Sequence, residues 1–187
     1  PFAHGPQVLC AKGVGALYIK DGIKITPIAH GGGHERKLRS GTENIPGIVG
    51  FAKSSEILTK KEIKKMVELR DKLIEGILKI PDTRLNGSRG EKRICNNVNV
   101  SFNNIEGEAI GGYLENLGIC TSTGSACMSH SLEPSHVLMA LGLTHVQANS
   151  SLRISISKYT TQEEVDYFLK ELPKIVEKLR RISPLVN

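Results

Sequence analysis

Cys127 is the residue whose type and surroundings point most directly to chemistry. It lies in the segment from Ser122 to Ser131, which reads STGSACMSHS and has no apolar periodicity. Thiols in regular cores are surrounded by Leu, Ile and Val, whereas Cys127 is surrounded by Ser, Gly, Ala and Thr, as suits an accessible thiol in a mobile loop. The residues alone leave two interpretations open: a reactive thiol, or a cysteine that is merely exposed.

A second candidate is the segment from His30 to Asn44, which reads HGGGHERKLRSGTEN. Its three consecutive glycines and its cations, Arg39 among them, suit an anion site, and an ordinary polar loop is the alternative. His30 and His34 have no carboxylate or thiol at ligand spacing, so we expect no metal there.

The totals exclude several classes of protein. The formal net charge is +6, but aromatic residues make up only 4% and the basic residues are dispersed, so a nucleic-acid partner is not expected. No run of 18 apolar residues and no signal peptide are present, which predicts a cytoplasmic protein without a membrane span. The four cysteines form no CxxC pair, so we expect reduced thiols and no structural metal.

Two parts must position these residues. In the first, short strands are expected at Gly13 to Lys20 and at Ile23 to Pro27. The former is a strand of the buried type that lacks its neighbours in this chain, so we expect it to expose apolar surface. A helix capped by Asn44 then runs to Pro81 with a break near Thr59. We place the domain boundary inside this helix, with domains at residues 1–55 and 56–187.

The second part mixes strands and helices, which predicts a compact α/β or α+β domain. The final helix begins with a capping box made by Thr161 and Glu164. The other expected elements are strands at Asn97 to Phe102, Ile119 to Ser122 and Leu152 to Ile156, and helices at Gly107 to Leu117 and Pro134 to Leu141.

Three blocks of sequence resemble the cysteine desulfurases of the NifS/IscS type, within the class V aminotransferase family. The longest is TSTGSACMSHSLEPSHVLMALG, which is similar to the family's active-site loop and the helix after it. The others are HGGGHERKLRSGTEN, similar to H-G-G-G-x-E-x-x-x-R-S-G-T-x-N, and SLRISISKYTTQEEVD, similar to S-x-R-x-S-L-G-R-x-T-T-x-E-x-x-D.

The resemblance implies the C-terminal part of a fold-type I transferase dependent on pyridoxal phosphate. Residues 1–55 would be a remnant of the large cofactor-binding domain, and residues 56–187 the small domain. The implied reaction converts L-cysteine to L-alanine and leaves sulfur as a persulfide on Cys127, for iron-sulfur cluster assembly.

By the same matching, Arg153 would hold the substrate's α-carboxylate, for which a planar guanidinium is suited. Thr42 would donate its hydroxyl to the cofactor phosphate of the other subunit of a homodimer, beside the amides of Ser40 and Gly41. The alternative for Arg153 is an ordinary surface arginine of a strand. The implied partners are L-cysteine, a second copy of the chain, and an iron-sulfur scaffold or another sulfur acceptor.

The sequence departs from the family pattern at its start. The stretch from Pro1 to Ala11 reads PFAHGPQVLCA. It has Gln7 at the position where the family has its Schiff-base lysine, and a glutamine amide forms no imine. Codons allowed for this stretch, read one base later, can give S-L-T-A-H-K-F-Y, so we hypothesise that residues 1 to about 11 are translated out of frame. Ser157 and Lys158 also replace a glycine and an arginine of the pattern.

The chain therefore looks truncated, and we expect it to be inactive alone. Two alternatives remain: another class V relative such as a selenocysteine lyase, and a non-catalytic interaction module or decayed gene product that retains the scaffold-binding C-terminus. The longer loop after Cys127 favours the NifS/IscS type over the lyase.

Overall fold

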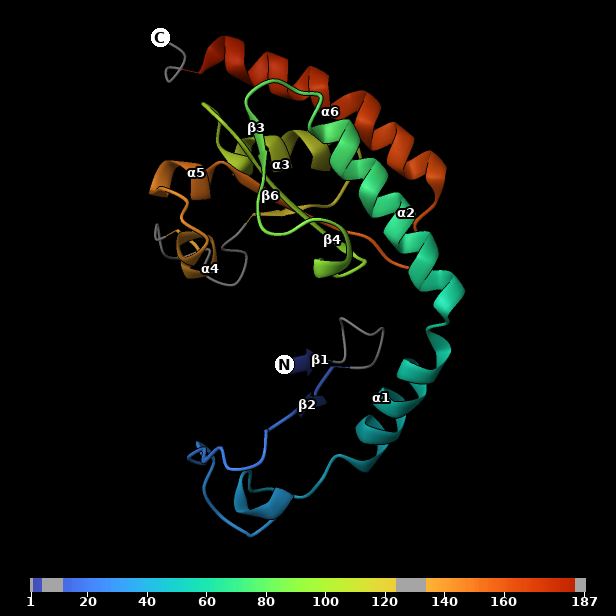
Figure 1. Ribbon diagram of the computed structural model, residues 1–187, viewed down its shortest axis with the longest axis vertical. Helices are drawn as coiled ribbons and strands as arrows, with labels where there is room; N and C mark the ends of the chain where they lie inside the picture. Colours follow the sequence, from blue (N-terminus) through green and yellow to red (C-terminus); the bar gives the residue numbers. More distant parts are fainter. Residues whose placement is uncertain (1, 5–11, 124–133, 184–187) are drawn as a thin grey trace. The chain divides into compact units, whose positions relative to one another are not determined.

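The helical segment after Asn44 is interrupted, as the sequence predicts. Helix α1 (Ile45–Ile57) ends before Thr59, and α2 (Lys60–Ile77) begins after it. In the computed structural model, which describes residues 2–4, 12–123 and 134–183, the chain divides into two units, 1–59 and 60–187 (Figure 1). The Asn44 side chain accepts a hydrogen bond from the Gly47 amide at 3.2 Å, which caps α1.

The first unit is sparsely packed. Its strands β1 (Phe2–His4) and β2 (Gly15–Leu17) form an antiparallel pair, and a short turn, η2, spans Glu35–Lys37. The strand expected at Gly13 to Lys20 forms as the short β2, and the apolar surface expected there is confirmed, because β2 is exposed throughout and no residue of the range 12–59 is buried. A strand needs a second layer to be covered, and this unit supplies none among its described residues.

The second strand expected in this unit, at Ile23 to Pro27, is not formed. Its first residue closes a turn instead, with the Ile23 amide donating to the Lys20 carbonyl at 3.2 Å. Pro27 has no N–H to donate to a neighbouring strand, which disfavours a strand at this end of the apolar segment from Ile23 to Pro27.

The second unit is built on a four-stranded antiparallel sheet with the order β3-β4-β6-β5. The strands are β3 (Thr83–Leu85), β4 (Asn97–Phe102), β5 (Ser122–Thr123) and β6 (Ser151–Ser155). The strands expected near β4, β5 and β6 are confirmed. Strand β3 was missed, because Asp82 to Arg93 is a polar stretch without an alternating pattern.

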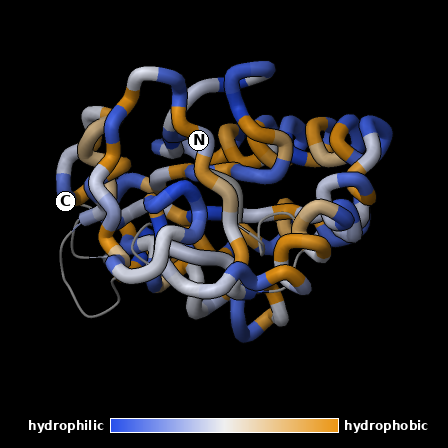
Figure 2. Tube along the Cα trace, turned by 90° about the horizontal axis from the view of Figure 1, so that it is seen from below, coloured by the Kyte–Doolittle hydropathy of each residue, from blue (hydrophilic) through white to orange (hydrophobic). Residues whose placement is uncertain are grey.

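Three helices cover one face of this sheet: α2, α3 (Gly107–Glu115) and α6 (Gln162–Ile182), which contact the strands or one another (Figure 1). Hydrophobic and hydrophilic residues alternate along the chain (Figure 2), and the apolar sides of these elements meet in the core. The capping box of Thr161 and Glu164 begins α6 as predicted. The core contains Val98, Val100, Phe102, Leu152, Ile154, Val165, Phe168, Leu172 and Val176.

Arg70 of α2 is an exception to this apolar core, because its side chain is only 2% exposed. It donates hydrogen bonds to the carbonyls of Arg93, at 2.8 Å, and Ile94, at 3.1 Å. Asp71 lies 2.7 Å from its guanidinium and compensates its charge. Arg70 therefore fastens the segment between β3 and β4 to α2.

Two short helices lie at one end of the sheet. The helix expected at Pro134 to Leu141 is shortened to α4 (His136–Ala140), and α5 (His145–Asn149) was not anticipated. Leu138, Leu143 and Ala148 form a small apolar cluster beneath them. The Ser101 hydroxyl of β4 donates to the Gln147 carbonyl at 2.8 Å, which ties α5 to the sheet.

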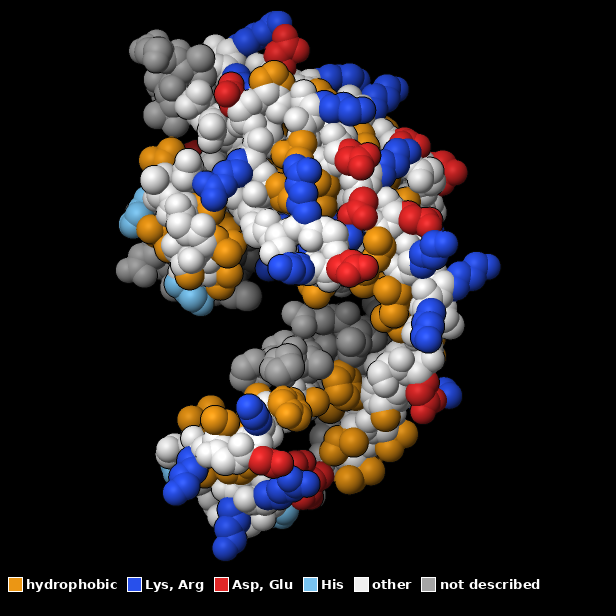
Figure 3. All heavy atoms as spheres, in the orientation of Figure 1, with side chains coloured by type: hydrophobic (Ala, Val, Ile, Leu, Met, Phe, Trp, Pro, Cys, Tyr) orange, Lys and Arg blue, Asp and Glu red, His pale blue; other side chains and the backbone are white. Residues whose placement is uncertain are grey.

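Charged side chains of both signs are interspersed over α2 and α6 (Figure 3), in agreement with the dispersed charges of the sequence. Among the helices of the described residues, none is long and apolar enough to cross a membrane.

Candidate functional site

A row of polar side chains crosses the face of the sheet opposite to the apolar core. Side chains alternate between the two faces of a strand, so Val98, Val100 and Leu152 point into the core while their neighbours point away. Asn99 and Ser122 are the register partners of Arg153 on its two sides. Asn86 lies beside Asn99, because its backbone N–H donates to the backbone carbonyl of Asn99 at 2.9 Å. We call Asn86, Asn99, Arg153 and Ser122 the polar row.

Arg153 is the only cation of this row and has no acidic partner among the described residues. Its side chain is exposed, and its one side-chain hydrogen bond runs from Nη2 to the Ser122 Oγ at 3.2 Å. A guanidinium carries five N–H donors, so most of them stay available. Arg153 can therefore receive a planar anion such as a carboxylate.

The other half of the row is a buried hydrogen-bond network. The Asn86 side chain is only 3% exposed, and its Nδ2 donates to the Asn99 Oδ1 at 2.7 Å and to the Ser101 Oγ at 2.9 Å. Sequence reasoning missed Asn86, Asn99 and Ser122. The alternation of Asn97 and Asn99 with valines was the available sign of a polar face, but the sequence does not show which residues lie opposite them.

Arg93 closes the row at its far end. Its Nη1 donates to the Asn97 Oδ1 at 3.3 Å, and its Nε donates to the Ser88 carbonyl at 2.5 Å. Burial, and then the positive charge of Arg70, lower the pKa of Arg93 from its usual high value. These bonds occupy Arg93 in holding the segment between β3 and β4.

Cys127 lies outside the described residues. Its place in the chain is four residues after Thr123, the last residue of β5. Strand β5 pairs with β6 through Ser122 with Arg153 and Thr123 with Leu152. Strand β5 therefore ends beside Leu152, the residue before Arg153.

The glycine-rich segment of the first unit forms a separate concave site. A cavity of about 250 Å³ is lined by Pro27, Ala29, His30, Gly31, Gly32, Gly33, Lys37 and Ser40. The φ values of Glu35, Arg36 and Lys37 are 47, 56 and 64°. They lie in the left-handed region, which residues other than glycine rarely adopt. Thr42 is exposed and does not line this cavity.

The amides expected to accompany Thr42 differ in their availability. The Ser40 amide donates to the Ala29 carbonyl at 3.3 Å, and its hydroxyl donates to the same oxygen at 3.1 Å, so this amide is already used. The Gly41 amide and the Thr42 hydroxyl have no hydrogen bond within the described residues. A Cβ on Gly41 would lie 2.7 Å from Arg39 Nη1, which shows that the guanidinium sits against this glycine.

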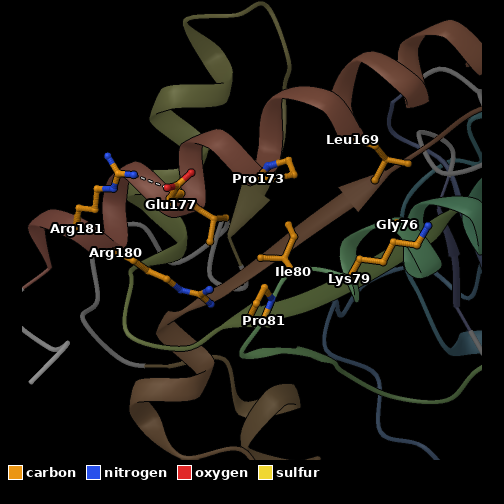
Figure 4. A pocket seen from close by; sticks show the side chains of 10 residues that line it. Gly76, Lys79, Ile80, Pro81, Leu169, Pro173, Glu177, Arg180 and Arg181 are labelled. Atoms are coloured by element: carbon orange, nitrogen blue, oxygen red, sulfur yellow. Dashed lines mark hydrogen bonds and ion pairs between the residues drawn. The ribbon is translucent and has the colours of Figure 1, made fainter.

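Another cavity, of about 770 Å³, lies between the end of α2 and α6, away from the polar row (Figure 4). Ile80, Pro81, Leu169 and Pro173 line it, and Arg181 at its rim is paired with Glu177. Within the described ranges no three His, Cys, Asp or Glu side chains gather as metal ligands.

Comparison with known proteins identifies the family. The model of the aminotransferase class-V family matches residues 3–168, and the chain belongs to this family. The chain is 54% identical over 177 residues to a cysteine desulfurase IscS of Methanosarcina thermophila, and 51% identical over 177 residues to cysteine desulfurase IscS 1 of Archaeoglobus fulgidus. The resemblance to NifS/IscS desulfurases inferred from the motifs is confirmed.

Solved structures agree with this assignment. A NifS-like protein matches with a TM-score of 0.71 and 41% identity over 91% of this chain, and one from Rickettsia africae with 0.64 and 28% over 83%. The mixed α/β architecture is that of part of a fold-type I enzyme, as expected. The match covers 93% of this chain but 44 and 46% of the two relatives, so the chain spans about half of their length.

Proposed function

We propose that this chain is the substrate-binding and sulfur-accepting part of a cysteine desulfurase. The observation that carries the proposal is Arg153, an exposed cation without an acidic partner among the described residues, hydrogen-bonded to the strand that leads to Cys127. A group that binds the substrate's carboxylate and a thiol that takes its sulfur must act on the same small molecule. Four extended residues reach about 14 Å, which keeps Cys127 within range of a substrate held by Arg153.

The roles of the two residues follow from the balance of the reaction. Arg153 holds the α-carboxylate of L-cysteine and so fixes the position of its sulfur. The Cys127 thiolate forms a new S–S bond to that sulfur while the substrate's C–S bond breaks, and the bond's electron pair stays with the carbon. Protonation of the carbon gives L-alanine, and Cys127 is left as the persulfide.

Cysteine desulfurases of this family use pyridoxal phosphate, which supplies the electron sink for such steps when it is bound. The segment around Gly41 fits the phosphate end of this group, because the Thr42 hydroxyl and the Gly41 amide have no hydrogen bond to any described residue and Arg39 lies against Gly41. The Ser40 amide does not take part, since Ala29 already accepts from it. A lysine for the covalent attachment is not supplied at Gln7.

Residues 1–55 are on this proposal the end of the large cofactor-binding domain, and they lie within the first unit, residues 1–59. Its lack of buried side chains among residues 12–59 supports a segment whose covering layers come from elsewhere in a complete enzyme. The remaining proposals rest on the resemblance: a homodimer in which Thr42 serves the partner's cofactor, a cytoplasmic location, and an iron-sulfur scaffold or another acceptor for the sulfur.

The experiment uses a restored protein, in which residues from Lys12 onward follow the N-terminal part of the Methanosarcina thermophila relative, with A-H-K-F-Y-G-P before Lys12. Cys127→Ala should abolish alanine formation from L-cysteine while the absorbance of the bound cofactor is retained. Cys120→Ala is the matched control, because Cys120 is an exposed thiol of the same region and should be dispensable. Undiminished turnover in Cys127→Ala would refute the proposed role of this thiol.

A further inference from the structure

Asn99 is the neighbour of Arg153 on the side away from Ser122. The two residues are register partners on β4 and β6, so their Cβ atoms are expected about 5 Å apart on the same face of the sheet. Asn99 is half-buried, and its Nδ2 has no acceptor among the described residues. A neutral donor therefore stands next to the unpaired guanidinium.

The orientation of the Asn99 amide is set by a chain of hydrogen bonds that starts at the backbone. The Gln147 carbonyl only accepts, so the Ser101 hydroxyl must give it its single hydrogen, across 2.8 Å. The Ser101 oxygen is then left to accept from Asn86, which places the Asn86 Nδ2 there at 2.9 Å. The second hydrogen of this Nδ2 is directed at Asn99, 2.7 Å away.

Asn99 must consequently present its oxygen to Asn86 and turn its NH2 group to the opposite side. The assignment of oxygen and nitrogen in a side-chain amide follows from its hydrogen-bond partners, and here every step of the chain has one direction. Asn86 is buried and fixed, so Asn99 cannot exchange its two ends without losing this bond. The network thus holds a donor ready on the exposed face.

We propose that the Asn99 Nδ2 donates to one oxygen of the substrate's α-carboxylate while Arg153 binds the carboxylate from the neighbouring strand. This inference rests on the proposed function, in which Arg153 is the carboxylate site. A carboxylate has two oxygens and about four acceptor positions, which a guanidinium and an adjacent amide can share. Because the amide is neutral, it adds a directed bond without a second charge.

The test measures inhibition of the restored protein by two small amines. L-alanine and ethylamine differ by the carboxylate, so their inhibition constants against L-cysteine separate carboxylate recognition from all other binding. The sharpest variant is Asn99→Asp, because its carboxylate still accepts from Asn86 but has no N–H to donate and carries a charge that pairs with Arg153. The matched control is Asn97→Asp, on the same strand and face but opposite Ser155 rather than Arg153.

Asn99→Asp should raise the inhibition constant of L-alanine about tenfold or more and leave that of ethylamine within about twofold. Asn99→Ala should act in the same direction, and Asn97→Asp should change neither constant. Thermal unfolding shows that each variant is folded at the assay temperature, because a lost folded fraction would lower the maximal rate and leave both inhibition constants unchanged.

Equal L-alanine constants in Asn99→Asp and the unaltered restored protein would overturn the inference, provided that Arg153→Ala still weakens L-alanine selectively. If Arg153→Ala also leaves the ratio of the two constants unchanged, the proposed carboxylate site itself is wrong, and the inference about Asn99 is wrong with it.

Discussion

Arg153 of β6 donates from Nη2 to the Ser122 Oγ of β5 across 3.2 Å, and Ser122 in turn donates to the Thr123 carbonyl at 3.2 Å. Strand β5 has only two residues, so these side-chain bonds supplement a short ladder. The carboxylate site that we propose and the start of the Cys127 segment are therefore connected through one hydroxyl.

Ser122→Ala should raise the KM for L-cysteine of the restored protein about threefold, because Arg153 loses the bond that orients it. Ser122→Thr keeps the hydroxyl and should restore most of the affinity. Ser155→Ala is the control, since Ser155 lies on the same strand face as Arg153 but bonds to none of these groups. A KM in Ser122→Ala equal to that of Ser155→Ala would show that the contact does not position Arg153.

Arg70→Met should lower the free energy of unfolding of the chain by about 2–3 kcal/mol. The methionine keeps much of the buried volume but leaves the carbonyls of Arg93 and Ile94 without their donor. Urea unfolding measures the effect, with Arg84→Met as the control because Arg84 is exposed on β3. Similar losses in the two variants would contradict the role given to Arg70.

Two glycines inside helices should respond to alanine to different extents. A Cβ on Gly76 of α2 would lie 2.6 Å from the Leu169 Cδ2 of α6, so Gly76→Ala forces the Leu169 side chain to turn aside and loses part of the gain in helix propensity. A Cβ on Gly112 of α3 meets nothing within 4 Å, so Gly112→Ala should stabilise the chain by about 0.5–1 kcal/mol through helix propensity. An unfolding midpoint of Gly76→Ala equal to or above that of Gly112→Ala would contradict this packing of α2 against α6.

The stability of the chain should depend on Asp166 in acid. Its hydrogen bond and ion pair with Lys72 lower the pKa of Asp166 below the ordinary value of about 3.9. A depressed pKa contributes stability above the ordinary value, and this contribution is lost as the pH falls through the folded-state pKa. Lys72→Met should therefore be less stable than the unaltered chain at pH 7, and the difference should shrink below about pH 4.

The control for this titration is Lys64→Met, on the same helix and exposed. Thermal unfolding across the pH range gives both differences. A deficit of Lys72→Met that stays constant down to pH 3, or that also occurs in Lys64→Met, would rule out the pair with Asp166 as its cause.

Local patterns predicted the elements that depend on local physics. The capping box at Thr161 fixes the start of α6, and the alternation from Asn97 to Phe102 identifies β4. Strand β3 was not predicted, because its three residues have no alternating pattern of their own and are extended through their pairing with β4. The apolar strand within Gly13 to Lys20 is exposed, as expected, because strand burial depends on covering layers that the apolar residues themselves do not supply.

The candidate site likewise contains residues that local motifs predicted and residues that only the pairing of strands brings together. Cys127, Arg153 and Thr42 came from motifs, and their roles remain proposals. Asn86, which follows β3, and Asn99 and Ser122 join Arg153 only through the pairing of strands that extend from residue 83 to residue 155. Register is set by long-range pairing, so no local pattern contains the polar row.

Alanine formation from L-cysteine with added pyridoxal phosphate, compared between the isolated chain and the restored protein, tests the central claim most directly. The isolated chain has Gln7 where a lysine is needed and spans about half of its relatives, so we predict no catalytic turnover from it. The restored protein should form alanine catalytically and carry one added sulfur atom on Cys127. Catalytic alanine from the isolated chain, or none from the restored protein, would contradict the claim that this chain is the sulfur-accepting half of a desulfurase.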